Sequence, residues 1–164
     1  MNTNGFQNTV KAKQAFGVVG EFRDSSVKRV LPFELGATAN IGNPAYLIAA
    51  SGKVTDKFAT GTAGKYLGVF VGPKEYVNND GDLNPTITMN PENGQAAQVA
   101  SLGHIIVIAG EAGIKVGNPA YFGPSGWCKT KPTAGTSVDA TQLGTFIDDA
   151  TAGEPVGVSV MVAI

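Results

Sequence analysis

One pentapeptide occurs twice in this 164-residue chain, and its repetition constrains the fold more than any other feature of the sequence. Gly42-Asn43-Pro44-Ala45-Tyr46 returns 75 residues later (42 to 117) as Gly117-Asn118-Pro119-Ala120-Tyr121. The apolar segments around the first copy, 30–33 and 67–70, also recur around the second, at 105–108 and 143–146. We therefore expect two copies of one structural unit, over about residues 29–76 and 104–149.

The residues of the repeat are those of β-strands joined by turns. An apolar, β-branched segment predicts a first strand in each copy, at 30–33 and 105–108. Proline fixes its own φ and biases the preceding asparagine toward an extended conformation, so Gly-Asn-Pro is expected to form a turn that leads into the next strand. A glycine-rich loop is expected to follow, at 50–65 and 123–141. The predicted structural turn residues are Gly42, Asn43, Pro44, Tyr46, Gly117, Asn118, Pro119 and Tyr121.

Composition favours an all-β fold. Glycine accounts for 22 of the 164 residues, and an interior glycine weakens a helix by about 1 kcal/mol relative to alanine. Strands at short intervals, separated by Gly, Pro, Asn and Asp, are typical of a small barrel or sandwich. We predict such a β-barrel or sandwich, built from both units around one shared core because each unit is too short to be stable alone.

Three segments lie outside the repeat. Residues 1–28 are predicted to form an extended N-terminal arm, distinct from a single β domain over residues 29–164. Residues 77–103 are predicted to be a polar excursion with at most one helical turn, near 93–100. The alternating residues 155–164 predict a closing strand.

The charge pattern argues against nucleic-acid and membrane partners. Twelve basic and 13 acidic residues give a net charge of −1, unlike the basic surface of a nucleic-acid-binding domain. The longest apolar run, 105–109, is far shorter than the ~20 residues that a membrane-spanning helix needs.

Charge is also sorted along the chain. The first 36 residues are net basic, whereas the residues after Lys131 carry only acidic charges, at Asp139, Asp148, Asp149 and Glu154. This sorting fits either a solvated surface or head-to-tail contact between neighbouring subunits.

No catalytic constellation is visible in the sequence. His104 is the sole histidine, and we expect it at the head of a strand as a polar edge residue rather than as a general base. Cys128 is the sole cysteine, which excludes an intrachain disulfide and a multi-cysteine metal site, and its position beside Trp127 indicates a packing role. We expect no enzyme activity, no metal and no cofactor.

The order of these segments resembles a known family. Val18–Phe22 comes first and is followed by the 42–46 turn, the 117–121 turn with Gly126-Trp127, the 143–146 segment and the alternating closing strand. Over about residues 10–164, this order is similar to that of the capsid cement, or decoration, proteins of tailed bacteriophages. The resemblance implies a β-rich structural protein that binds the outer surface of the phage head and stabilises it by bridging major capsid protein subunits. Residues 77–94 have no counterpart in the family pattern.

The predicted arm suggests how such a protein could bind. Extended arms can add as strands to the edge of a partner's sheet. The residues expected to contact the capsid or a neighbouring subunit are Phe6, Val10, Lys11, Lys13, Phe16 and Val18. The resemblance further implies a homotrimer, or alternatively a homodimer, on the exterior of a virion and made in the host cytoplasm. Two other functions stay open, namely a phage tail or baseplate β module and a domain that binds a small ligand or a carbohydrate.

Overall fold

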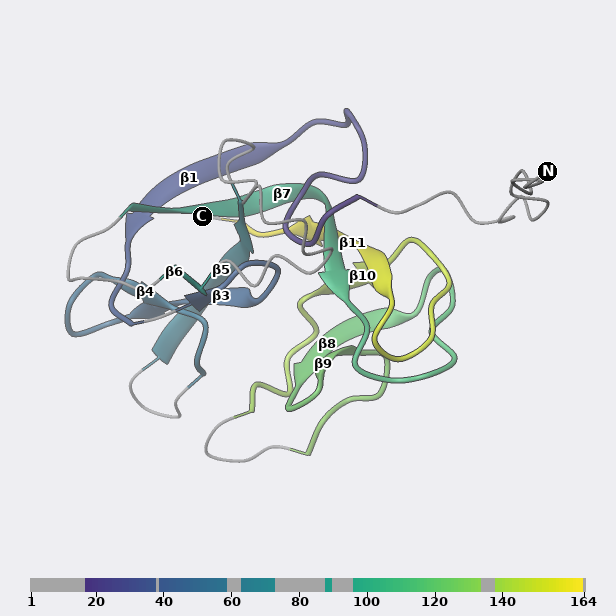
Figure 1. The fold of residues 1–164 in the computed structure, drawn as a ribbon. Coiled ribbons are helices and arrows are strands. Elements are labelled where there is room, and N and C mark those ends of the chain that lie inside the picture. The colour runs from purple at the N-terminus through teal and green to yellow at the C-terminus, as the bar shows by residue number, and fades with distance from the viewer. Residues whose placement is uncertain are drawn as a thin grey trace, which may run out of the picture.

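The computed structural model describes residues 17–37, 39–58, 63–72, 88–89, 96–133 and 138–163. These residues form strands and turns, and none of them lies in a helix (Figure 1). The all-β class predicted from composition is therefore confirmed. No helix in the described ranges is long and apolar enough to cross a membrane. The strands are β1 (Arg29–Glu34), β2 (Ala39–Asn40), β3 (Pro44–Ile48), β4 (Val54–Thr55), β5 (Ala63–Val71), β6 (Thr88–Met89), β7 (Ala96–Ile108), β8 (Pro119–Gly123), β9 (Gly126–Cys128), β10 (Gly144–Phe146) and β11 (Pro155–Met161).

Nine of these strands form two units that have the same strand order. The first unit runs β4-β3-β5-β7-β1, and the second runs β9-β8-β10-β11-β7. The 13-residue strand β7 belongs to both units, because its first half pairs with β1 and β5 and its second half pairs with β11. In Figure 1, β3, β4 and β5 gather in one lobe and β8 and β9 in the other, with β7 passing between them.

The repeated turns form the same hydrogen bonds in both units. The turn glycine donates from its backbone N–H to the carbonyl of a phenylalanine, Gly42 to Phe70 and Gly117 to Phe146, at 2.8 Å in each case. The φ angles of the two glycines are 85° and 84°, in the left-handed region that favours glycine. The pentapeptide therefore marks an equivalence that extends to individual backbone atoms.

The sheet is not closed, but each unit curls until its outer strands meet. In the first unit an isolated parallel bridge joins Leu35, just after β1, to Val54 of β4. In the second unit the corresponding bridge joins Ala109, just after β7, to Trp127 of β9. The predicted small barrel thus takes the form of two curled units within one open sheet.

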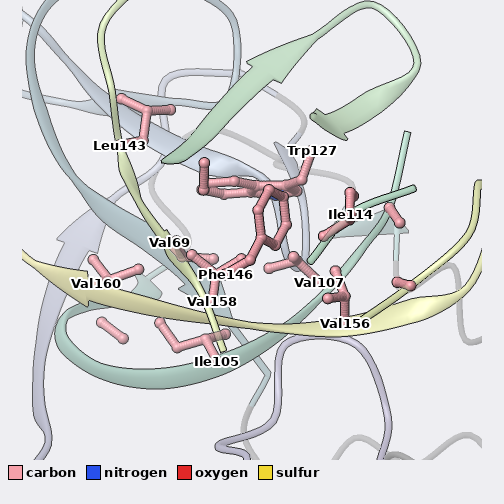
Figure 2. Close-up of a cluster of buried hydrophobic side chains, with 14 of the residues drawn as sticks. Val69, Ile105, Val107, Ile114, Trp127, Leu143, Phe146, Val156, Val158 and Val160 are labelled. Atoms are coloured by element: carbon pink, nitrogen blue, oxygen red, sulfur yellow. The ribbon is translucent and has the colours of Figure 1, made fainter. Parts of the chain in front are cut away.

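Two buried apolar clusters fill these units, and β5 contributes to both. Because alternate strand residues point to opposite faces, Phe70 packs into the first cluster while Val69 and Val71 pack into the second. Figure 2 shows Trp127 and Phe146 at the centre of the second cluster. The structure thus has two apolar clusters, linked through β5, in place of the one shared core predicted from the sequence.

One boundary predicted from the sequence is wrong. Residues 96–103 are the first half of β7, and not the end of a polar excursion or a helical turn. Ala97 and Val99 are buried while Ala96 and Gln98 are exposed, which is the alternation of a strand. His104 consequently lies within a strand and not at its head. Residues 77–87 and 90–95 of the predicted excursion fall outside the described residues.

Candidate interaction surface

Residues 17–28, which we call the strap, lie along the second half of β7. The N–H of Gly20 donates to the carbonyl of Ile106 at 2.8 Å, and the N–H of Arg23 donates to the carbonyl of His104 at 2.7 Å. Most of the strap is thus bound to the sheet although it was predicted to belong to the arm. An arm that leaves the domain can include residues 1–16 at most, and these residues, with Phe6, Val10, Lys11, Lys13 and Phe16, fall outside the described part of the chain.

One ion pair and one histidine–carboxylate hydrogen bond fasten the strap to the sheet. Arg23 Nε lies 3.2 Å from Asp148 Oδ2, and His104 Nδ1 lies 2.6 Å from Asp24 Oδ2. Hydrogen bonds from Ser26 and from His104 hold the pKa of the Asp24 carboxyl well below its usual range. His104 therefore acts as an anchor for the strap, which is a more specific role than the edge position expected from the sequence.

The strap also contacts the first unit, at its repeated turn. The carbonyl of Gly20 accepts a hydrogen bond from the N–H of Gly72 at 3.3 Å. A Cβ atom at Gly42 would lie 2.4 Å from Cγ1 of Val19, so only glycine allows this close approach. The carbonyl of Gly42 accepts a 2.7 Å hydrogen bond from the buried indole Nε1 of Trp127, which belongs to the second unit. The first turn is therefore the place where the strap and both units meet.

The second turn, at residues 116–119, is open to solvent. A Cβ atom at Gly117 would have no neighbour within 4 Å, and Val116 is 64% exposed. Beside it, Asp149 accepts a 3.0 Å hydrogen bond from the N–H of Val116 and a 2.8 Å bond from Lys115 Nζ. The same turn is thus covered in one unit and bare in the other.

The remaining predicted residues have structural roles in the turns. Asn43 donates from Nδ2 to the buried carboxylate of Asp56 at 2.9 Å, whereas Asn118 accepts from the N–H of Lys115 at 2.9 Å. The prolines begin β3 and β8, so the turns lead into strands as predicted. Tyr46 is buried and Tyr121 is half-buried. Val18, the described member of the predicted contact set, is 39% exposed.

The placement of the His, Cys, Asp and Glu side chains in the described residues bears on two kinds of chemistry, a metal site and a reactive thiol. No three His, Cys, Asp or Glu side chains in the described ranges are placed to hold a metal ion. The Cys128 thiol donates to the carbonyl of Thr130 at 3.3 Å, and burial raises its pKa.

Both the sequence and the fold of this chain are similar to those of known phage proteins. The family model described as structural cement protein (E217 gp24/Pam3 gp6) matches residues 6–161. A chain in the solved structure titled "The capsid of Myoviridae Phage XM1" has the same fold, with a TM-score of 0.64 and 18% identity over 97% of this chain and 99% of that chain. No curated protein matches the chain. Because the family model spans nearly its whole length, the chain belongs to the structural cement proteins of phages.

Proposed function

We propose that this protein attaches to the outer surface of the assembled phage head and stabilises the head by bridging neighbouring major capsid protein subunits. The match of a structural cement protein model to residues 6–161 is the observation that carries this proposal. The protein would act by binding alone and would catalyse no reaction.

A bridging protein must keep its contact points at fixed separations, and the fold supports this requirement. The two units share strand β7 and apolar packing across β5. The indole of Trp127 and the strap add polar links between the units. Moving one unit relative to the other would break main-chain hydrogen bonds along β7 and apolar contacts across β5.

We propose that the N-terminal residues 1–16 reach from the two units to neighbouring subunits. Sixteen extended residues span at most about 55 Å, and the strap holds their attachment point at Gly17 against β7. We propose that Phe6, Val10, Lys11, Lys13, Phe16 and Val18 contact neighbouring subunits on the head. Self-association as a homotrimer, or alternatively as a homodimer, would add further links.

Electron microscopy of heads tests the proposal. Heads assembled from the major capsid protein are imaged before and after addition of the purified protein, at a resolution that separates subunits. We expect regular added density on the outside of the head, with each copy touching at least two capsid subunits. Density confined to a tail or baseplate, or unchanged heads at saturating protein, would contradict the proposal.

A further inference from the structure

The hydrogen bonds that close the two units show which residues of β1 and β7 are equivalent. The N–H of Gly36, just after β1, donates to the carbonyl of Val54 at 2.8 Å. The N–H of Gly110, just after β7, donates to the carbonyl of Trp127 at 2.7 Å. β1 therefore matches the second half of β7 with an offset of 74 residues (36 to 110), which is one residue less than the offset of the repeated pentapeptide.

The strand ladders give the same match further along β1. Leu31 stands opposite Val99, and Ile105 stands opposite Val158. Each of these valines also stands opposite the phenylalanine whose backbone bonds to the repeated turn. Leu31 and Ile105 are therefore equivalent, and so are the residues that follow them in the chain.

Pro32 of β1 consequently corresponds to Ile106 of β7, and at Ile106 the second unit pairs with the strap. The carbonyl of Ile106 accepts from the N–H of Gly20 at 2.8 Å, and the N–H of Ile106 donates to the carbonyl of Glu21 at 2.9 Å. Proline has no N–H to donate. The pairing that holds the strap to the second unit therefore cannot be repeated at the same place on the first.

The position of Pro32 matters because its backbone faces the outer edge of the sheet. The backbone of Phe70 bonds to the first turn, so that of Val99, opposite it, bonds to Leu31 on the other side. Val30 and Pro32, on either side of Leu31, therefore direct their backbone groups away from β7. Among the described residues, no segment pairs with this edge before the bridge that closes the unit. In Figure 1, β1 lies along β7 as the outer strand of its lobe.

We infer that Pro32 closes the outer edge of β1 to strand pairing, so that the sheet of one copy of this chain does not extend into the sheet of another. An open edge strand is a template for pairing with a second chain, and proline at such an edge removes a donor that the second strand needs. A strand that bonded to both free positions, Val30 and Pro32, would lose the bond at Pro32. The self-association proposed above would then use a different surface.

Replacing the proline in the full-length chain tests this inference. Pro32→Val restores the N–H, and we expect self-association about tenfold stronger than that of the parent in sedimentation velocity, because paired β1 edges gain main-chain hydrogen bonds. Glu34→Val is the matched control, since it puts the same side chain on the same exposed face of β1 and keeps the proline. Its lost ion pair with Lys53 is exposed and adds little stability. This control should associate like the parent.

Amide hydrogen exchange followed by NMR identifies the surface that associates. In the parent, the N–H of Val30 should exchange rapidly, because it faces outward without a partner. In the associated Pro32→Val variant, this N–H and the amide restored at position 32 should both become protected. The protection should disappear on dilution, when the variant dissociates.

Three results would overturn the inference. Protection of the Val30 amide in the parent would show that the edge is already paired. Association of Glu34→Val as strong as that of Pro32→Val would assign the effect to added apolar surface. Unchanged association and exchange in Pro32→Val would show that the proline blocks nothing. Pro32→Ala restores the N–H with a smaller side chain, and it decides between these outcomes if Pro32→Val does not fold.

Discussion

At the scale of single residues, Gly42 and Gly117 form a natural matched pair. Both have a positive φ that costs about 1–2 kcal/mol for an alanine, but only a Cβ at Gly42 would meet Val19, at 2.4 Å. We expect Gly117→Ala to lower the free energy of unfolding by about the backbone cost alone. Gly42→Ala should lower it further, because the strap has to move. Urea unfolding of the two variants measures the difference. Equal losses in the free energy of unfolding would contradict the close contact between the first turn and the strap.

Asp24 makes the fastening of the strap dependent on pH. Hydrogen bonds from Ser26 and from His104 lower the pKa of this carboxyl in the folded protein. A carboxyl with a lowered folded pKa stabilises the fold above its unfolded pKa of about 3.9, and this contribution is lost as the pH falls through the folded pKa.

We therefore predict that Asp24→Asn is less stable than the parent at pH 7, and that this difference narrows below about pH 4. Urea midpoints between pH 2 and pH 7 measure the difference. A difference that stays constant over this range, or that is absent at pH 7, would refute a role for the ionised carboxylate.

At the scale of elements, the arm predicted over residues 1–28 has two parts, the strap at residues 17–28 and the N-terminal residues 1–16. Residues 17–28 belong to the folded domain through their pairing with β7, whereas residues 1–16 are proposed to bind neighbours. Deleting residues 1–15 should therefore leave the thermal midpoint nearly unchanged and abolish stable attachment to heads. Differential scanning calorimetry and co-sedimentation with heads measure the two effects. Retained attachment would move the capsid contact to the two units, and unfolding would show that the deleted residues belong to the core.

Local signals predicted the longer strands of the repeat, because apolar alternation and turn residues lie next to one another in the sequence. Strands β4 and β9 were predicted as loops. They have two and three residues, and they form because β3 and β8 supply their hydrogen-bonding partners. A segment of two or three residues is too short to show the apolar alternation by which a strand is predicted.

The contacts of the candidate surface were likewise hidden in the sequence. Trp127 and Gly42 are 85 residues apart, and Asp24 and His104 are 80 apart. Being the sole tryptophan and the sole histidine, Trp127 and His104 were visible as unusual residues. Their partners could not be predicted, because a single sequence shows no long-range pairing.

At the scale of the whole molecule, the scarcity of charge predicts how the head contact responds to salt. The chain has 12 basic and 13 acidic residues, so apolar burial and main-chain hydrogen bonds should dominate attachment to the head. Such contacts are insensitive to screening, whereas exposed ion pairs weaken as the Debye length falls from about 10 Å at 0.1 M salt to about 3 Å at 1 M. We expect the protein to stay bound through this range in co-sedimentation with heads. Release at moderate salt would show that ion pairs carry the contact.

We propose that this structural cement protein stabilises the head by binding to its assembled form. A ligand that binds only the intact lattice raises the stability of that lattice by mass action. The most direct measurement is thermal disruption of bare heads and of heads decorated with the full-length protein, followed in the same buffer by calorimetry and by release of the capsid contents. We predict that decorated heads break at a higher temperature and that heads given the 1–15 deletion break with the bare ones. Identical disruption of bare and fully decorated heads would contradict the cement function.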